Sequence, residues 1–169
     1  MTGRLNSLVW ENAAYLDQIH AFLLNTPQEW YVEMRPPFAR GGIGKHIRHV
    51  LEFYQLVLGA ENGVVDYDSR KRESILEEDP EHAASRALEL KSVLRDFSDR
   101  EDEPVTLVYS DEHDSQRISS TIGRELMFLT SHTVHHMAII RMIYELLGGN
   151  VPDTFGVAPS TLRYEESGG

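Results

Sequence analysis

A long apolar stripe near the C-terminal end of the chain constrains the fold more than any other feature. From residue 121 to residue 147, apolar side chains return every three or four positions, and Gly148 follows directly. This spacing is typical of an amphipathic helix with one buried face, and glycine is common just beyond a helix end. We therefore predict a helix over these residues, with its apolar face toward a core.

Three other segments show the same periodicity. They cover residues 5–24, 42–59 and 79–97, and the last begins with Asp79 as an N-cap and Pro80 in the first turn. Four helices of about 20 residues, joined by one long crossover connection, predict an all-α fold, the four-helix bundle.

The remaining segments carry weaker patterns. Residues 105–110 and 116–120 are compatible with a small β-hairpin before the last helix. Prolines and glycines predict irregular structure for residues 26–42, and residues 150–169 form an irregular tail. We expect residues 1–169 to form a single domain.

Charge and residue usage exclude several classes of function. The chain has 16 Lys and Arg against 27 Asp and Glu, a formal net charge of −11 at pH 7. This balance argues against binding to nucleic acid or to an anionic membrane surface. The chain has no cysteine, which excludes disulfides, thiolate metal ligands and a cysteine nucleophile. Because no apolar run could cross a membrane and the N-terminus lacks a signal-peptide pattern, we expect a cytoplasmic location.

Three histidines of the last predicted helix stand within five residues. His132 and His136 are one turn apart, about 40° from each other around the helix axis, and both fall inside the apolar stripe. His135 is rotated by about 100° to the edge of the stripe. A pair of histidines at positions i and i+4 can offer two imidazole nitrogens to one metal ion.

The second predicted helix supplies a third imidazole, from His46 or His49. If the two helices face each other, three neutral ligands and one open position form, the pattern of a catalytic metal site. Zinc and nickel both suit imidazole donors, and metal affinity should fall as the pH drops through about 6.5. The competing interpretation is that these are core histidines with satisfied hydrogen bonds.

Four charged residues have two interpretations each. Glu125 and Glu52 could hydrogen-bond a ligand histidine or neutralise an arginine. Arg70 and Arg72 belong to a short basic run, which could receive an anionic substrate group or simply balance acidic neighbours in a solvated loop.

The two histidine segments resemble the DinB-like superfamily of small metalloenzymes, also called the YfiT-like fold. The resemblance rests on GIGKHIRHVLEFY in the second predicted helix and ELMFLTSHTVHHMAII in the last, and VDYDSRKR and FGVAPSTLRYE extend it over nearly the whole chain. It implies a four-helix bundle and a metal triad of one histidine from the second helix and an i, i+4 pair from the last. Those positions are His49, His132 and His136 here, with His46 as an additional histidine.

Two functions from different classes follow. The first is an enzyme that depends on a divalent metal, acting on a small-molecule substrate by transfer to a low-molecular-weight thiol, as the resemblance implies, or by metal-assisted hydrolysis. The second is a non-catalytic helical module of stress-response type that binds metal or dimerises. The resemblance also implies a homodimer, which the second predicted helix permits because it is apolar on more than one side.

Overall fold

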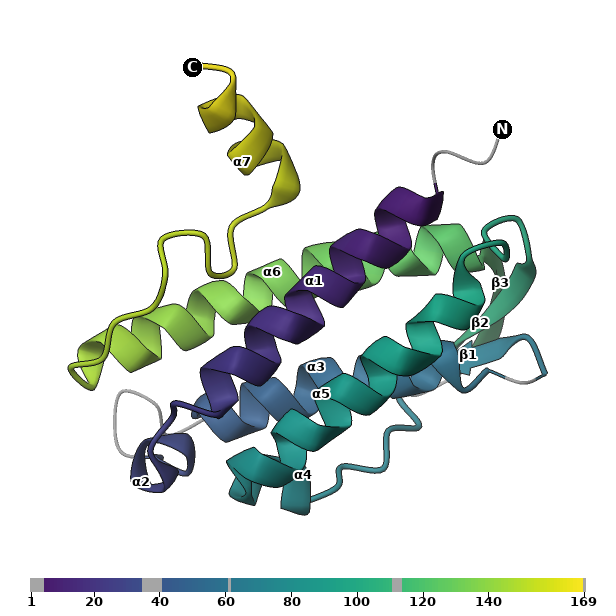
Figure 1. Ribbon diagram of the computed structural model, residues 1–169. Coiled ribbons are helices and arrows are strands. Elements are labelled where there is room, and N and C mark those ends of the chain that lie inside the picture. The colour runs from purple at the N-terminus through teal and green to yellow at the C-terminus, as the bar shows by residue number, and fades with distance from the viewer. Residues whose placement is uncertain (1–4, 35–40, 61, 111–113, 169) are drawn as a thin grey trace.

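The computed structural model describes residues 5–34, 41–60, 62–110 and 114–168. Four long helices form its main body (Figure 1): α1 (Leu5–Leu23), α3 (Ile43–Leu58), α5 (Pro80–Leu94) and α6 (Ile122–Leu146). Helices α1 and α3 each pack against both α5 and α6, so the four helices enclose one core. Their bounds agree closely with the sequence-based predictions.

The core takes one apolar stripe from each of these helices. Fully buried side chains include Leu16, Ile19, Ile47, Leu51, Leu94, Leu126 and Leu129. Asp79 caps α5 as predicted, because its Oδ1 accepts hydrogen bonds from the backbone N–H groups of Glu81 and His82. Among the described residues, no helix is both long and apolar enough to cross a membrane.

A three-stranded mixed sheet lies at one end of the helices (Figure 1). Its central strand β2 (Pro104–Ser110) pairs antiparallel with β3 (Ser115–Thr121) and parallel with β1 (Val64–Asp66). The hairpin expected before the last helix is therefore present, although its connection at 111–113 lies outside the described residues. The chain is not an all-α protein, and the prediction of a pure four-helix bundle is wrong.

Strand β1 escaped prediction because it is too short to show a period of two. Its hydrogen-bonding partner is also distant in the sequence, since Val65 pairs with Leu107. What holds the strand is burial: Val65 is 1% exposed and packs in the same core as Val105 of β2.

Four shorter helices complete the described residues: α2 (Gln28–Tyr31) and α7 (Pro159–Glu166) lie in segments predicted to be irregular, α4 (Ile75–Glu78) lies in the connection before α5, and the 3-10 helix η1 (Arg95–Phe97) forms the end of the helix predicted at 79–97. Residues 35–40 of the loop predicted at 26–42 lie outside the described residues. In the tail, Phe155 is buried, and Gly156 adopts a φ of +68° where an added Cβ would lie 2.7 Å from Met137 Cβ. A glycine at this position thus lets the tail approach α6 closely.

A buried polar network ties three helices together. Asn12 of α1 is fully buried and donates hydrogen bonds to the backbone oxygens of Leu8 and Leu126, at 2.8 and 3.1 Å. Its Oδ1 accepts a 2.7 Å hydrogen bond from the Tyr54 hydroxyl of α3. The Thr133 hydroxyl of α6 donates to the Tyr54 oxygen at 3.3 Å.

We expect Asn12→Ala to lower the free energy of unfolding by about 3 kcal/mol, because it leaves the Leu126 carbonyl and the Tyr54 hydroxyl buried with fewer partners. Urea denaturation followed by circular dichroism measures this loss. Asn25→Ala is the matched control, since Asn25 is exposed in the turn after α1 and its side chain donates to the Ala21 carbonyl of that helix, so its effect should stay within about 0.5 kcal/mol. Equal effects of the two substitutions would contradict a structural role for this network.

Candidate metal centre

Helices α3 and α6 bring three histidines together. His49 lies in the second turn of α3, and His132 and His136 lie one turn apart in the middle of α6. Each offers one ring nitrogen, and these three atoms all lie within 4.8 Å of one another. All three side chains are half-buried, so the cluster has a protein side and a side open to solvent.

The nitrogen positions are compatible with ligation of one metal ion. His132 Nε2 lies 3.1 Å from His49 Nε2 and 3.1 Å from His136 Nε2. In a tetrahedral zinc site, with nitrogens about 2.0–2.1 Å from the metal, ligand nitrogens are about 3.3–3.4 Å apart. The donor set therefore fits zinc or nickel after small ring movements, and among the described residues it comprises these three histidines.

The other two histidines occupy different places around this cluster. His46, one turn before His49, is half-buried and its Nδ1 lies 2.8 Å from Nδ1 of His136. With a metal on His136 Nε2, the Nδ1–H of His136 would donate to His46, the kind of contact that orients a metal-binding imidazole. His135 is exposed, and its ring contacts the edge of His136 at a centroid distance of 5.1 Å.

His132 contributes a buried atom without a hydrogen bond. Among the described residues, its Nδ1 has no hydrogen-bond partner, whereas its Nε2 faces the other two histidines. The interpretation of this residue as a core histidine with satisfied hydrogen bonds therefore does not fit its surroundings.

Aromatic rings form one wall of the site. Phe53 stacks on His132 with ring centroids 4.2 Å apart. Tyr67 in turn stacks on Phe53, with ring centroids 4.8 Å apart. Phe128 stacks on His132 at 5.5 Å. This wall was not predicted, although Phe53 and Phe128 each stand one helical turn from a histidine and could have been found by that spacing. Tyr67 had no such periodic signal.

Arg70 reaches the histidine cluster from the connection between β1 and α4. Its Nη1 donates a hydrogen bond to His49 Nδ1, and its Nε donates to the Tyr67 carbonyl at 3.0 Å. The guanidinium carbon lies over the Phe53 ring, 5.2 Å from the centroid. Arg72, by contrast, is exposed and has a φ of 51°.

Both carboxylates considered in the sequence analysis hold the segment that carries Arg70. Glu125, fully buried, accepts hydrogen bonds from the Tyr67 hydroxyl, from Ser120 Oγ at 2.5 Å and from Arg124 Nη1 at 2.9 Å. Glu52, 1% exposed, accepts from the Glu73 backbone N–H at 2.8 Å and has Arg48 Nε at 4.0 Å from its other oxygen. Neither carboxylate contacts a histidine ring in these interactions, so each matches the interpretation as a partner of arginine.

Burial and neighbouring cations keep the histidines neutral. Burial lowers the pKa of His49 to about 3, with Arg70 and His132 adding to the shift, and it lowers the pKa of His136 to about 3 with help from His132 and His49. The pKa of His132 falls to about 4, mainly through burial and then through His135. Protons should therefore compete with a metal nearer pH 4 than the pH of about 6.5 expected for free histidine.

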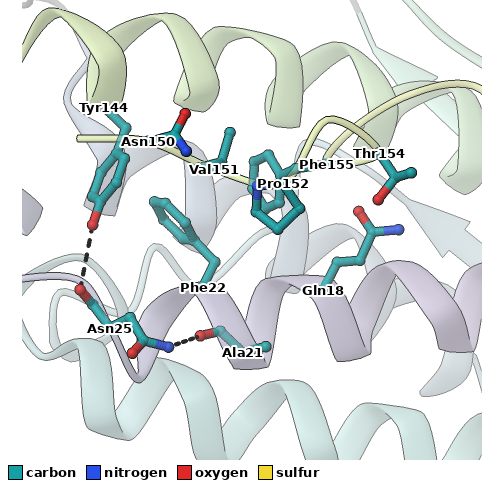
Figure 2. Close-up of a pocket in the computed structure, with 10 residues that line it drawn as sticks. All are labelled: Gln18, Ala21, Phe22, Asn25, Tyr144, Asn150, Val151, Pro152, Thr154 and Phe155. Carbon is teal, nitrogen blue, oxygen red and sulfur yellow. Dashed lines mark hydrogen bonds between the residues drawn. The ribbon is translucent and has the colours of Figure 1, made fainter. Parts of the chain in front are cut away.

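A cavity of about 450 Å³ lies elsewhere, between α1, the end of α6 and the segment 150–155 (Figure 2). Phe22, Tyr144 and Phe155 make its apolar surface, and Phe22 packs edge-on against Tyr144 at 4.9 Å. The Gln18 side chain accepts a hydrogen bond from the Gly156 N–H, and the Asn25 side chain donates one to the Ala21 carbonyl. None of the clustered histidines lines this cavity.

Comparison with known proteins gives one partial similarity to report. A protein of Rhizopus delemar named FK506-binding protein 5 is 37% identical to this chain over 106 residues, which are 60% of this chain and 27% of that protein. The chain thus spans about a quarter of its relative's length. No family model matches the chain, and no solved structure matches it. The relative's name and the mixed fold both conflict with the description of the chain as a DinB-like four-helix bundle, which we do not retain.

Proposed function

We propose that the chain is an enzyme that depends on a divalent metal held by His49, His132 and His136. The observation that carries the proposal is the approach of three imidazole nitrogens from two helices, with His132 Nε2 3.1 Å from each of the other two. Three neutral ligands beside an open position are typical of catalytic rather than structural metal sites. Zinc or nickel is the proposed cofactor.

The surroundings favour chemistry on a small molecule. When bound, a divalent metal acts as a Lewis acid that lowers the pKa of a thiol or of water. The rings of Phe53, Tyr67 and Phe128 would exclude water from one side, while His46 would orient His136. Because the chain has no cysteine, a thiol would have to come from a substrate; the reaction is then either transfer to a low-molecular-weight thiol or hydrolysis.

The alternative from another class is a non-catalytic module that binds metal or dimerises. The relative's name says that it binds FK506, but the similar stretch is only 27% of that protein, so this property is not carried over here. A homodimer and a cytoplasmic location stay predictions. Light scattering would test the dimer; within the chain, α3 packs against α4, α5 and α6.

Metal analysis of the full chain, purified without a histidine tag, tests the proposal. We expect one zinc or nickel ion per chain after loading and desalting, and a higher melting temperature in the loaded protein because the ion binds only the folded state. Assays with thiol acceptors and with ester or amide substrates then separate transfer from hydrolysis. Metal well below one per chain under replete conditions, with no change in melting temperature, would overturn the proposal in favour of the non-catalytic module.

A further inference from the structure

The contact between Arg70 and His49 has a chemical consequence for any metal at this site. A guanidinium has only donors, so the Nδ1 of His49 that receives Arg70 must be the acceptor nitrogen of its ring. The proton of the neutral ring is then on Nε2, the nitrogen that faces His132. This proton lies on Nε2 where a metal ion would have to bind.

A metal on either nitrogen of His49 is incompatible with this contact. If the metal binds Nε2, the ring proton moves to Nδ1 and two donors, Nδ1–H and the guanidinium, then face each other. If the metal binds Nδ1, it takes the lone pair that Arg70 uses. In both cases a second cation would also lie close to the fixed charge of Arg70.

Arg70 is nonetheless held in place at its base. Its Nε donates to the Tyr67 carbonyl, and the guanidinium lies over Phe53. Tyr67 is in turn fixed by Glu125, and the far end of the segment is fixed by the hydrogen bond from the Glu73 N–H to Glu52. Loss of the His49 contact would therefore free the outer nitrogens of Arg70 while keeping them beside the aromatic wall and the open side of the cluster.

We propose that Arg70 is a specificity-determining residue: metal binding releases it from His49, and its guanidinium then binds the carboxylate of the substrate. This inference rests on the proposed metal site and adds the substrate class, a carboxylate. Arg suits this role because its planar fork binds a carboxylate through two hydrogen bonds. Metal and carboxylate then support each other's binding, while Arg70 alone opposes the metal.

Calorimetric titration of zinc into the full, untagged chain tests both steps, with benzoate as the carboxylate probe. Arg70→Met keeps the unbranched apolar stem over Phe53 but removes the donors. We expect it to bind zinc at least about tenfold more tightly than wild type, since a hydrogen bond to a charged group is lost only from the metal-free state. Benzoate should strengthen zinc binding by the wild type and leave zinc binding by Arg70→Met unchanged.

Lys71→Ala is the matched control, because it removes one exposed positive charge from the same segment. It should bind zinc and benzoate as the wild type does. If it has the same effect as Arg70→Met, the effect comes from the loss of any positive charge in this segment, and the inference is overturned. Zinc binding by Arg70→Met that is equal to or weaker than wild type would also overturn it, as would an equal benzoate effect in both proteins. If none of the three proteins binds zinc, the proposed metal site itself fails.

Discussion

His132→Ala and His136→Ala are expected to lower metal affinity by more than about 100-fold, while His135→Ala leaves it nearly unchanged. Replacing partners of ligands already costs about 10–100-fold, so removal of a ligand should cost more. His132 and His136 face His49, whereas His135 is exposed beside the cluster. All three variants replace a histidine by alanine within one helical segment, so a difference in metal affinity between them reflects the position of the side chain.

Metal content and melting temperature, each with and without a chelator, measure this difference. At free metal 100 times above Kd, the wild type should gain about 2.7 kcal/mol of stability, or roughly 5–10 °C for a chain of this size. His135→Ala should keep that gain, and the other two variants should lose it. If His132→Ala and His136→Ala change stability by the same amount with and without chelator, these histidines serve only the fold.

Acid should destabilise the metal-free protein well before its carboxylates are protonated. The pKa values of His49, His132 and His136 are depressed to about 3, 4 and 3 in the folded chain, against about 6.5 in the unfolded chain. Below pH 6.5 the unfolded state takes up protons that the folded state does not, so the free energy of unfolding falls as the pH falls. The contribution is fully present above about pH 6.5 and is lost progressively toward pH 4.

The expected loss between pH 7 and pH 5 is on the order of 3 kcal/mol, after allowing for solvent screening of rings that are only half-buried. Urea denaturation in the presence of a chelator at pH 7, 6 and 5 measures it. A variant in which glutamine replaces His49, His132 and His136 is the control and should show a much flatter dependence. A wild-type profile as flat as that of the variant would mean that the histidines titrate like exposed ones.

Local patterns were sufficient to predict the four long helices because each carries its own periodic stripe and end signals. Asp79 and Pro80 marked the start of α5, and Gly148 marked the end of α6. The parallel pairing of β1 with β2 could not be predicted in this way, because it depends on residues such as Val65 and Leu107 that meet only after the helices have packed. The error in fold class has two parts: this non-local pairing, and the β2–β3 hairpin, which the prediction of an all-α fold treated as a minor addition.

The candidate site could also be predicted only where helix periodicity applies. His49, His132 and His136 could be grouped because helix geometry fixes which side chains share a face. The partners of Glu125 and Glu52 could not be deduced, since Tyr67 and Glu73 come from a connection without periodicity. Spacing made both carboxylates candidate partners of a ligand histidine or of an arginine, but it carried no information about which loop would meet them.

The segment from Tyr67 to Glu73 is anchored on Glu125 at one end and on Glu52 at the other, whereas the histidines stand on α3 and α6. The proposed metal ligands and the proposed substrate-binding arginine thus come from separate stretches of the chain. Substitutions between the two anchors could therefore change substrate specificity while the histidine cluster is conserved. Sequence change would then be concentrated in the five residues 68–72, between two anchors that stay constant.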